Sequence, residues 1–532
     1  MTYPGIGSWP SIRRLRTPEK TALVFGETRF TYREFADATD RIASMLTVMG
    51  VGKGDAVAYI GENSPAFLQT LFGATRIGAV FVPVNTRLAP PEVTHVLTDS
   101  GARVLIYDTE LYEKVAPGIE AAGVPHVIPT GEGDEADPGL DRLAALATDA
   151  PAPVNVSPDD AAVYMYTSGT TGRSKGAVLT HENLTFVALN CVLDYDLLSN
   201  EVALLISPLF HAAALGMGAL PIVLKGATIV LEKGFEPGRA LALIQRHGIT
   251  MLSGVPTTYQ LMADHPDWGK TDLSSLRRLT CGGSAVPTRI LDVYEERGLH
   301  FTQGYGMTET SPGHTALPAG RTREKQGSVG LPHFFSSVRI AGEDGALLPP
   351  SEVGEIEVLG PNVFPGYLHL PEANAQSFRP DGWFRTGDMG YLDEDGYLFI
   401  SDRLKDMIIS GGENIYPAEV ENHLFDIDGV TGAAVIGVPD EKWGEVGWAI
   451  LTVRDGAEVT TQHVQERLTG RIARYKIPKN VVIVDELPRT ASGKVRKADL
   501  RARFAGRPEI VHPTGTAIPW QTETIRTASK GR

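Results

Sequence analysis

Cysteine is scarce in this chain, with only Cys191 and Cys281 among its 532 residues. Because these two lie far apart in the sequence, neither a disulfide scaffold nor a cysteine metal site is expected, and a reducing cytoplasm suits the composition. No stretch reaches the roughly 18 consecutive apolar residues of a transmembrane helix, and the first residues, Met1 to Arg16, lack the apolar run of a signal peptide. The sequence therefore predicts a cytoplasmic protein with no integral membrane segment.

An excess of positive charge is also missing. The 49 basic residues are outnumbered by 64 acidic ones, which leaves a formal net charge of -15. This balance disfavours nonspecific binding to nucleic acid or to anionic membranes, so nucleic acid is excluded as a partner. A chain of this length, with 42% hydrophobic residues, is too long for a single core and predicts two or more globular domains.

Helical and strand patterns alternate through the first half of the chain. Thr31 and Glu34 have the spacing of a capping box and predict a helix from there to Met49 and Gly50. Further segments continue the alternation, which is typical of an α/β fold with mostly parallel sheets. These segments are Ala56–Ile60, Ala66–Ile77, Val80–Pro83, Val104–Tyr107, Val202–Pro208, Gly216–Leu224 and Thr228–Leu231.

The pattern changes in the second half. Short strands punctuated by Gly, Pro and Asp between Val338 and Leu398 predict a small, distorted β-barrel, and a compact α+β unit of about 100 residues follows, ending near Phe504. Residues 506–532 are rich in Pro, Thr and charge, and we expect a disordered tail there.

One polar loop indicates phosphate binding. Residues 167–176 combine hydroxyls, glycines, Arg173 and Lys175, so backbone N–H groups, hydroxyls and cations would surround phosphate oxygens. The apolar runs Ala162–Tyr166 and Ala177–His181 predict a strand on each side. A Walker-type loop is excluded, because Lys175 is followed by glycine and no helix begins there.

The chain resembles the adenylate-forming superfamily, in its acyl-CoA synthetase branch, over about Thr21 to Phe504. The resemblance rests on a series of motifs in the family's order and spacing, namely Thr167–Gly176, Gly304–Thr310, Gly382–Asp388, Asp402–Asp406, Ser410–Asn414 and Pro488–Lys494. It implies a large N-terminal domain over residues 1–402, with two stacked α/β sheets and the small barrel. A hinge at 403–406 and a mobile α+β domain at 407–505 would complete the fold.

The resemblance also implies a set of residues around ATP. Glu309 and Thr167 would hold Mg²⁺, a cation that prefers oxygen ligands. Tyr305 would lie against the adenine, Asp388 would accept both ribose hydroxyls, and Arg403 would lie near ribose and phosphate. The other nucleotide-binding positions implied are Ser168, Gly169, Thr170, Thr171, Gly172, Lys175, Gly282, Gly283, Ser284, Gly304, Gly306, Met307 and Thr308, with Thr308 also placed in the catalytic set.

The resemblance implies roles for two lysines in a reaction of two steps, in which the adenylate forms first and a thiol then attacks it. Lys494 would bridge acyl and phosphate oxygens while the adenylate forms. Lys405 would be the hinge about which the small domain rotates before the thiol attacks. After rotation the loop that begins at Ser410 would face the adenylate. The coenzyme A positions implied are Arg87, Ser410, Gly411, Gly412, Trp443, Tyr475 and Lys476.

The acid itself is constrained by the residues after Phe210. Amino-acid-activating relatives have an aspartate at the position of His211, and without it a substrate ammonium would be buried unpaired. His211 is implied to be a gate between acyl pocket and thiol tunnel. The remaining pocket residues are small or adaptable and favour an aliphatic, medium-chain acid, although an aryl acid stays open. These residues are Ala212, Gly216, Met217, Gly254, Gly304 and Met307.

The sequence thus predicts an ATP-dependent acyl-CoA synthetase that uses ATP, Mg²⁺ and coenzyme A and acts as a monomer or homodimer. An acyl-AMP ligase that loads a partner acyl carrier protein is the alternative, but such ligases carry an insertion near the hinge and none is visible between Ile400 and Ile409. A non-catalytic adenylate-binding protein would be expected to lack Lys494 or Glu309, and both are present.

Overall fold

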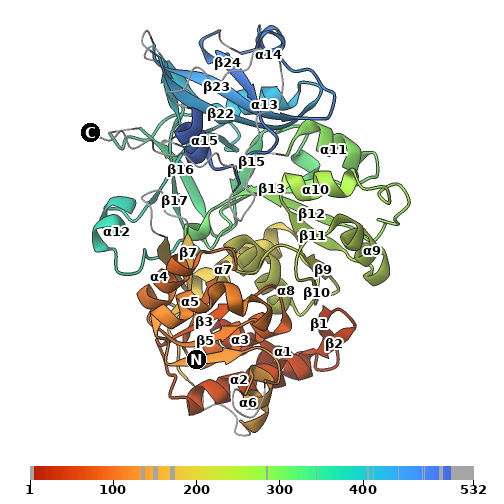
Figure 1. Cartoon of the computed structure of the whole chain (residues 1–532), viewed down its shortest axis with the longest axis vertical. Coiled ribbons are helices and arrows are strands. Elements are labelled where there is room, and N and C mark those ends of the chain that lie inside the picture. The colour runs from red at the N-terminus through yellow and green to blue at the C-terminus, as the bar shows by residue number, and fades with distance from the viewer. Residues whose placement is uncertain are drawn as a thin grey trace, which may run out of the picture. The chain divides into compact units, whose positions relative to one another are not determined.

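The structure is a computed structural model. It describes residues 5–133, 138–147, 154–167, 174–282, 286–342, 344–403, 406–410, 413–440, 443–469, 471–472, 474–489 and 495–504. The chain forms two compact units (Figure 1): Met1–Arg339, Glu357–Thr386 and Leu392–Phe399 make the first, and Ile340–Ile356, Gly387–Tyr391 and Ile400–Arg532 make the second. Across the described ranges, no helix has both the length and the apolar character needed to cross a bilayer.

The first unit contains a six-stranded sheet in the order β6-β5-β3-β4-β7-β8. Its strands are parallel except for β8, which runs antiparallel to β7. Strand bounds are β3 Ala56–Ile60, β4 Val80–Val84, β5 Ala102–Tyr107, β6 His126–Pro129, β7 Ala161–Thr167 and β8 Lys175–Thr180. The predicted strand pair around the polar loop is confirmed, but His181 begins helix α7 and does not belong to β8, because Thr180 is the helix cap.

A second run of nine strands in the first unit has the order β15-β14-β13-β12-β11-β9-β10-β1-β2. The middle of this run, from β13 to β1, is parallel, so the carboxyl ends of its strands meet at one edge, where ligands bind in α/β folds. Strand bounds are β1 Thr21–Phe25, β2 Thr28–Thr31, β9 Val202–Leu205, β10 Thr228–Leu231, β11 Met251–Gly254, β12 Arg278–Gly282, β13 Phe301–Tyr305, β14 Thr315–Leu317 and β15 Ser328–Pro332.

Helices cover these sheets. The predicted capping box is present: Thr31 accepts from the backbone of Glu34 and Glu34 accepts from that of Thr31, and the helix spans Tyr32–Val48. The helices of the first unit are α1 Trp9–Arg16, α2 Tyr32–Val48, α3 Pro65–Arg76, α4 Pro90–Asp99, α5 Tyr112–Ala122, α6 Leu140–Leu146, α7 His181–Asp194, α8 Leu220–Lys225, α9 Pro237–His247, α10 Pro256–Ala263, α11 Thr288–Glu295 and α12 Pro371–Ser377.

The region predicted as a barrel forms short strands, and each of them contributes residues to both units. They are β16 Ser337–Ala341, β17 Gly354–Leu359, β18 Phe384–Leu392 and β19 Leu398–Arg403.

The second unit is built on a sheet with the order β21-β20-β23-β22, and β24 pairs with β23. Alternate residues of β22 enter two different cores, because side chains of a strand point to opposite faces. Val435 packs in the core of α13 and α14, whereas Ile436 packs in the core of α15. Bounds are β20 Ile408–Ser410, β21 Glu413–Ile415, β22 Val430–Asp440, β23 Gly444–Val453, β24 Asn480–Ile483, α13 Pro417–Phe425, α14 Thr461–Leu468 and α15 Lys497–Phe504. The mixed α/β class with a smaller α+β unit is as predicted, while the hinge at 403–406 stays a prediction.

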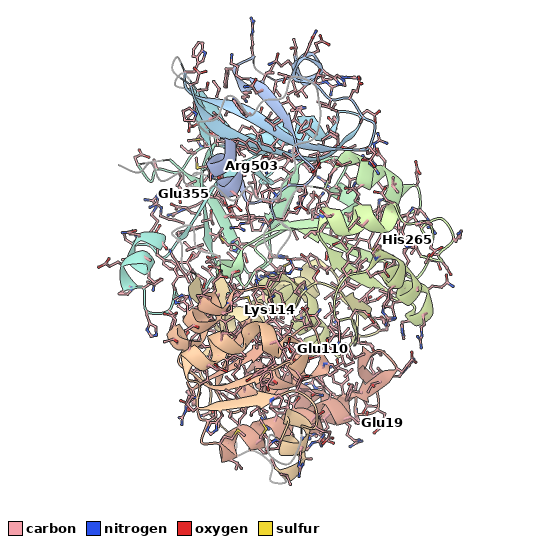
Figure 2. The ribbon with its side chains drawn as sticks, viewed as in Figure 1. Glu19, Glu110, Lys114, His265, Glu355 and Arg503 are labelled. Atoms are coloured by element: carbon pink, nitrogen blue, oxygen red, sulfur yellow. The ribbon has the colours of Figure 1, made fainter. Side chains whose placement is uncertain are left out.

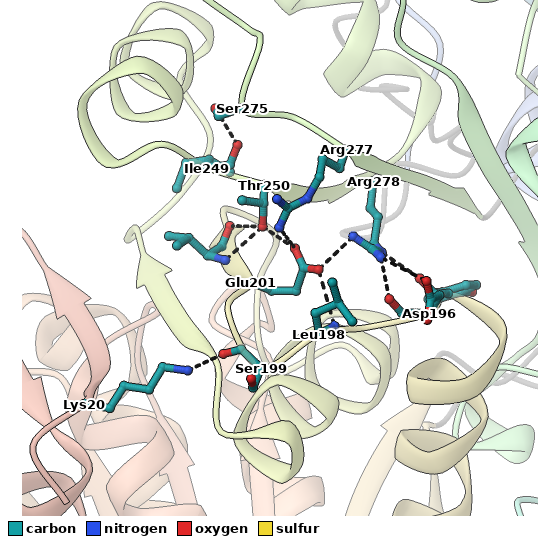
Figure 3. A network of polar contacts seen from close by, with 12 residues as sticks. Lys20, Asp196, Leu198, Ser199, Glu201, Ile249, Thr250, Ser275, Arg277 and Arg278 are labelled. Atoms are coloured by element: carbon teal, nitrogen blue, oxygen red, sulfur yellow. Dashed lines mark hydrogen bonds and ion pairs between the residues drawn. The ribbon is translucent and has the colours of Figure 1, made fainter. Parts of the chain in front are cut away.

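A buried carboxylate joins the amino-terminal ends of three strands in the first unit. Glu201 is fully buried and pairs with Arg278 at 2.7 Å and with Arg277 at 3.2 Å, and it also accepts a hydrogen bond from Thr250 (Figure 3). Arg278 in addition donates to the carbonyls of Tyr195, at 2.7 Å, and Asp196. The guanidinium therefore ties the carboxyl end of α7 to the start of β12, a favourable place for a cation.

Replacement of Arg278 by methionine is expected to destabilise the first unit by about 3 kcal/mol, since it leaves a fully buried carboxylate with one guanidinium fewer. Chemical unfolding monitored by tryptophan fluorescence measures the effect. Arg246→Met is the matched control, because Arg246 and its partner Glu27 are both largely exposed, and it should leave the midpoint unchanged. Equal unfolding midpoints for the two variants would contradict the stabilising role given to Arg278.

Candidate active site

The ends of the polar loop are held together by the β7–β8 hairpin. Thr167 and Lys175 are its last cross-strand pair, and the Thr167 hydroxyl lies 3.5 Å from the Lys175 carbonyl oxygen. The hairpin thus places a hydroxyl and an ammonium on either side of the loop's opening. The predicted phosphate ligands between them, Ser168, Gly169, Thr170, Thr171 and Gly172, lie outside the described residues.

Tyr367 connects this hairpin to Glu309. Its backbone bridges Ala177 of β8, and two flanking hydrogen bonds, Val178 N to Gly366 O at 3.0 Å and Leu368 N to Gly176 O at 2.8 Å, fix the segment. The Tyr367 hydroxyl donates to Glu309 Oε1 at 2.7 Å. Lys175 Nζ lies 5.1 Å from the centroid of the Tyr367 ring. The structure therefore brings together Lys175 and Glu309, which are more than 130 residues apart in sequence, through one aromatic ring.

Sequence reasoning missed Tyr367. Its only local signal is the turn-forming Pro365-Gly366 before it, which describes an ordinary loop. Burial, then the charge of Glu309, then the hydrogen bond to it, raises the pKa of Tyr367, so the phenol keeps its proton and remains a donor.

Glu309 suits a divalent cation. It lies in the single 3-10 turn Thr308–Thr310, directly after β13, and its side chain is buried. Tyr367 takes one acceptor site of a carboxylate that has about four, so capacity for a hard cation remains. No group of three or more His, Cys, Asp or Glu that could hold a metal occurs in the described ranges. Apart from the predicted ligand Thr167, a Mg²⁺ ion here would take its other ligands from substrate phosphates and water, as Mg²⁺ commonly does.

Two asparagines hold the turn that carries Glu309. Asn362 Nδ2 donates to the carbonyls of Thr310 and Gly313, at 3.0 and 2.8 Å, and lies 3.2 Å from His314 Nδ1. Asn183 of α7 donates to the carbonyls on either side of Asn362. Burial lowers the pKa of His314 to about 4, so the imidazole is neutral and can accept from Asn362.

Three glycines assigned to ligand pockets are required for backbone packing. A Cβ at Gly306 would lie 1.5 Å from the Pro312 oxygen, one at Gly216 would lie 2.4 Å from the Ser311 oxygen, and one at Gly304 would lie 2.7 Å from the Thr315 oxygen. These separations exclude any side chain. Residues 311–315 therefore demand glycine at all three positions whichever acid binds.

The other residues of the first unit predicted to bind the nucleotide lie at or just after the carboxyl ends of neighbouring strands. Gly282 ends β12 opposite Gly304 of β13, and Tyr305 ends β13 with its side chain buried. Met307 precedes the turn, and its N–H donates to Thr310 Oγ1 at 3.0 Å. Gly283 and Ser284 lie outside the described residues.

Four of the predicted acyl residues lie in an irregular helix or just before it. His211 stacks near Phe210, with ring centroids 4.8 Å apart, and Ala212 precedes the π-helix Ala213–Ala219 that carries Gly216 and Met217. Such single π-turns occur frequently at functional sites. Gly254 ends β11, where a Cβ would lie 3.1 Å from Thr258.

The residues predicted to bind coenzyme A are divided between the two units. In the first, Arg87 follows β4 in a loop held by Lys114, which donates to the carbonyl of Thr86 at 2.7 Å and is labelled in Figure 2. In the second, Trp443 and Tyr475 are exposed at 42% and 41%, while Lys476 is paired with Glu419 at 2.7 Å.

The remaining predicted residues belong to the second unit. Asp388 is buried within β18, directly after Gly387, whose φ is 70°. Ser410 is buried at the end of β20, and Arg403 is the last residue of β19, with its side chain outside the description. Lys405, Gly411, Gly412 and Lys494 lie outside the described residues, so their roles stay predictions.

Comparison with known proteins decides the family. Residues 13–368 match the AMP-binding enzyme family, and residues 419–494 match the AMP-binding enzyme C-terminal domain. The chain belongs to the AMP-binding enzymes. It falls in their acyl-CoA synthetase branch, whose members are acid–thiol ligases, which confirms the family expected from the motif series.

Three similar proteins show how far the likeness extends. The chain is 50% identical to a feruloyl-CoA synthase of an Amycolatopsis species over 95% of this chain and 100% of that protein. It is 39% identical to the long-chain-fatty-acid–CoA ligase FadD13 of Mycobacterium tuberculosis, over 90% and 94%. The structure of o-succinylbenzoate coenzyme A synthetase from Bacillus subtilis in complex with ATP and magnesium ion matches with a TM-score of 0.82 at 34% identity, covering 93% of this chain and 99% of that one.

Proposed function

We propose that this chain is an ATP-dependent ligase that joins an aryl-substituted carboxylic acid, of the hydroxycinnamate class, to coenzyme A. The observation that carries the proposal is the 50% identity to a feruloyl-CoA synthase along all of that enzyme. In the first half-reaction a carboxylate oxygen attacks the α-phosphorus of ATP and pyrophosphate leaves. In the second the thiol sulfur of coenzyme A, as it loses its proton, attacks the acyl carbonyl carbon and AMP leaves.

The identity to the feruloyl enzyme favours an aryl acid over the medium-chain aliphatic acid that the small pocket residues suggested. The likeness to a fatty-acid ligase, 39% over nearly the same span, keeps the aliphatic acid as the second candidate. Because Gly216 and Gly304 are required by the packing of residues 311–315, their lack of side chains does not indicate a long alkyl channel. The absence of side chains at these two positions therefore gives little support to a medium-chain aliphatic acid.

The residues around Glu309 would act in the first half-reaction. Lys175 and the loop 168–173 would neutralise the phosphates, and Glu309, oriented by Tyr367, would hold Mg²⁺ together with Thr167. The metal, when bound, offsets the charge of the β- and γ-phosphates and of departing pyrophosphate. The buried carboxylate of Asp388 accepts hydrogen bonds from both ribose hydroxyls, and Arg403 lies near the ribose. Tyr305 packs on the adenine.

The thiol step uses the second unit in a different orientation, turned about Lys405. The pantetheine arm then runs along the loop formed by Ser410, Gly411 and Gly412. His211 controls access of the thiol to the acyl group. The exposed aromatic rings of Trp443 and Tyr475 suit contact with the nucleotide of coenzyme A. Lys476 contributes less charge than expected, since Glu419 already neutralises it.

A pyrophosphate-release screen with ferulate, cinnamate, indoleacetate and octanoate, each with and without coenzyme A, tests the proposal. We expect hydroxycinnamates to have the highest kcat/KM, with thioester formed only when coenzyme A is present. Preference for octanoate would favour the aliphatic candidate. Pyrophosphate release without thioester formation would favour the acyl carrier protein as acceptor, and no release with any acid would favour a non-catalytic protein.

A further inference from the structure

A buried imidazole lies beside the predicted acyl pocket and takes no part in the roles assigned above. His333 Nδ1 lies 2.5 Å from Asp194 Oδ2, and the same oxygen accepts from the backbone N–H of Phe334 at 3.2 Å. The His333 side chain is fully buried, while Asp194, the last residue of α7, is partly exposed. The contact with the carboxylate favours the tautomer that carries its hydrogen on Nδ1, and this tautomer presents Nε2 as a hydrogen-bond acceptor.

That acceptor is an exception to the usual pairing of buried polar atoms. Within the described part of the chain, His333 Nε2 is buried and has no hydrogen-bond partner. Such an atom costs about 1–3 kcal/mol if it stays unpaired, and most buried polar atoms in native structures have a partner from the protein or from ordered water. His314, by contrast, uses both of its nitrogens, one with Ser337 and one with Asn362.

The position of Nε2 connects it to the acyl residues. A Cβ on Gly313 would lie 3.3 Å from His333 Nε2 and 2.9 Å from Met217 Cε, so the imidazole and Met217 flank the same glycine. The Tyr195 ring packs against His333, with centroids 5.9 Å apart, and its hydroxyl lies 3.7 Å from where a Cβ on Gly304 would be. Met217 and Gly304 are both predicted to line the acyl pocket.

The two segments that carry this cluster are held rigidly. Arg278 binds the carbonyls of Tyr195 and Asp196 at the end of α7 (Figure 3). One turn earlier, Asn190 accepts from the backbone of Phe335 at 3.2 Å and lies 3.3 Å from the hydroxyl of Ser336. The acceptor is therefore positioned in advance, as recognition of one polar group in an apolar pocket requires.

We propose that His333, oriented by Asp194, recognises a hydroxyl on the aromatic ring of the acid by accepting its hydrogen bond at Nε2. This inference rests on the proposed function and assigns the specificity for hydroxylated over unsubstituted aryl acids to one pair of residues. His333 is a specificity-determining residue and takes no part in either bond-forming step. A hydroxyl satisfies the buried nitrogen, whereas a hydrogen or a methoxy group leaves it unpaired.

The test compares 4-hydroxycinnamate, 4-methoxycinnamate and cinnamate as substrates of the full-length enzyme. Wild type is expected to prefer the hydroxy acid by about tenfold or more in kcat/KM, the value of one buried hydrogen bond. In His333→Leu the preference should fall to about twofold or less, while cinnamate keeps its own kcat/KM within a few-fold. His300→Leu, which changes an exposed histidine, should keep the wild-type ratio.

Each contrary result has a distinct meaning. If wild type has equal kcat/KM for the hydroxy acid and for cinnamate, this inference is overturned and the proposed function stays in place. This comparison uses wild type alone, so it does not depend on whether a variant folds. A His333→Leu enzyme that retains the wild-type preference also overturns it. If wild type turns over no aryl acid, the proposed function fails and the inference fails with it.

Discussion

Glu309→Gln is expected to slow adenylate formation by about a hundredfold or more, because the amide keeps the shape of the carboxylate but removes the charge that would hold Mg²⁺ against the phosphates. Tyr367 would still have an acceptor for its hydrogen bond, so the turn after β13 should keep its conformation. Pyrophosphate release over a range of Mg²⁺ concentrations measures the effect, and a raised Mg²⁺ requirement should accompany the lower rate.

Tyr367→Phe tests a smaller change at the same site. It removes the hydroxyl that orients Glu309 but leaves the charge, so we expect a loss of about tenfold, the value of one hydrogen bond. Glu352→Gln, at an exposed turn, is the matched control and should behave as wild type. If Glu309→Gln retained wild-type rates at every Mg²⁺ concentration, the metal would have to be held elsewhere.

Lys494→Ala is expected to abolish adenylate formation from acid and ATP while thioester formation from a presynthesised acyl-adenylate continues. The reason is that the proposed lysine contact exists only in the first arrangement of the two units. Separate assays of the two half-reactions measure this difference. Lys479→Ala removes an exposed lysine of the same unit and should affect neither step.

Equal loss in both half-reactions would contradict a role restricted to the first, provided that circular dichroism shows a folded variant. Unchanged adenylate formation would remove Lys494 from the catalytic set. Either result leaves the role of Glu309 untouched, because Glu309 and Lys494 belong to different units and are tested by different variables.

Local signals carried much of the fold. Thr31 and Glu34 cap α2 because their side chains need only a spacing of three residues, which the sequence contains in full. Strands such as β3 and β4 were predicted because both of their faces are buried and their residues form continuous apolar runs. His181 was placed wrongly because Thr180 is suited both to a strand and to a helix cap.

Contacts between distant segments could not be predicted in this way. Tyr367 reaches Glu309 only because its loop adds to the edge of β8, and His333 meets Asp194 only because β15 ends beside α7. Neither residue has neighbours in sequence that distinguish it from an ordinary aromatic or core residue. The pocket glycines suggested an aliphatic acid for the same reason. The backbone that excludes a side chain at Gly304 comes from Thr315 on another strand, which the sequence around Gly304 does not show.

By itself the sequence determined the family and the alternation of helices and strands, because residue types at short spacings encode caps and strands and because the motifs occur in the family's order. Only the tertiary structure decided how Glu309 is oriented, why the pocket glycines are required and that the buried Nε2 of His333 lacks a hydrogen-bond partner within the described residues. Orientation, close approach and an unpaired atom are properties of several segments at once, and such properties exist only after packing has brought those segments together.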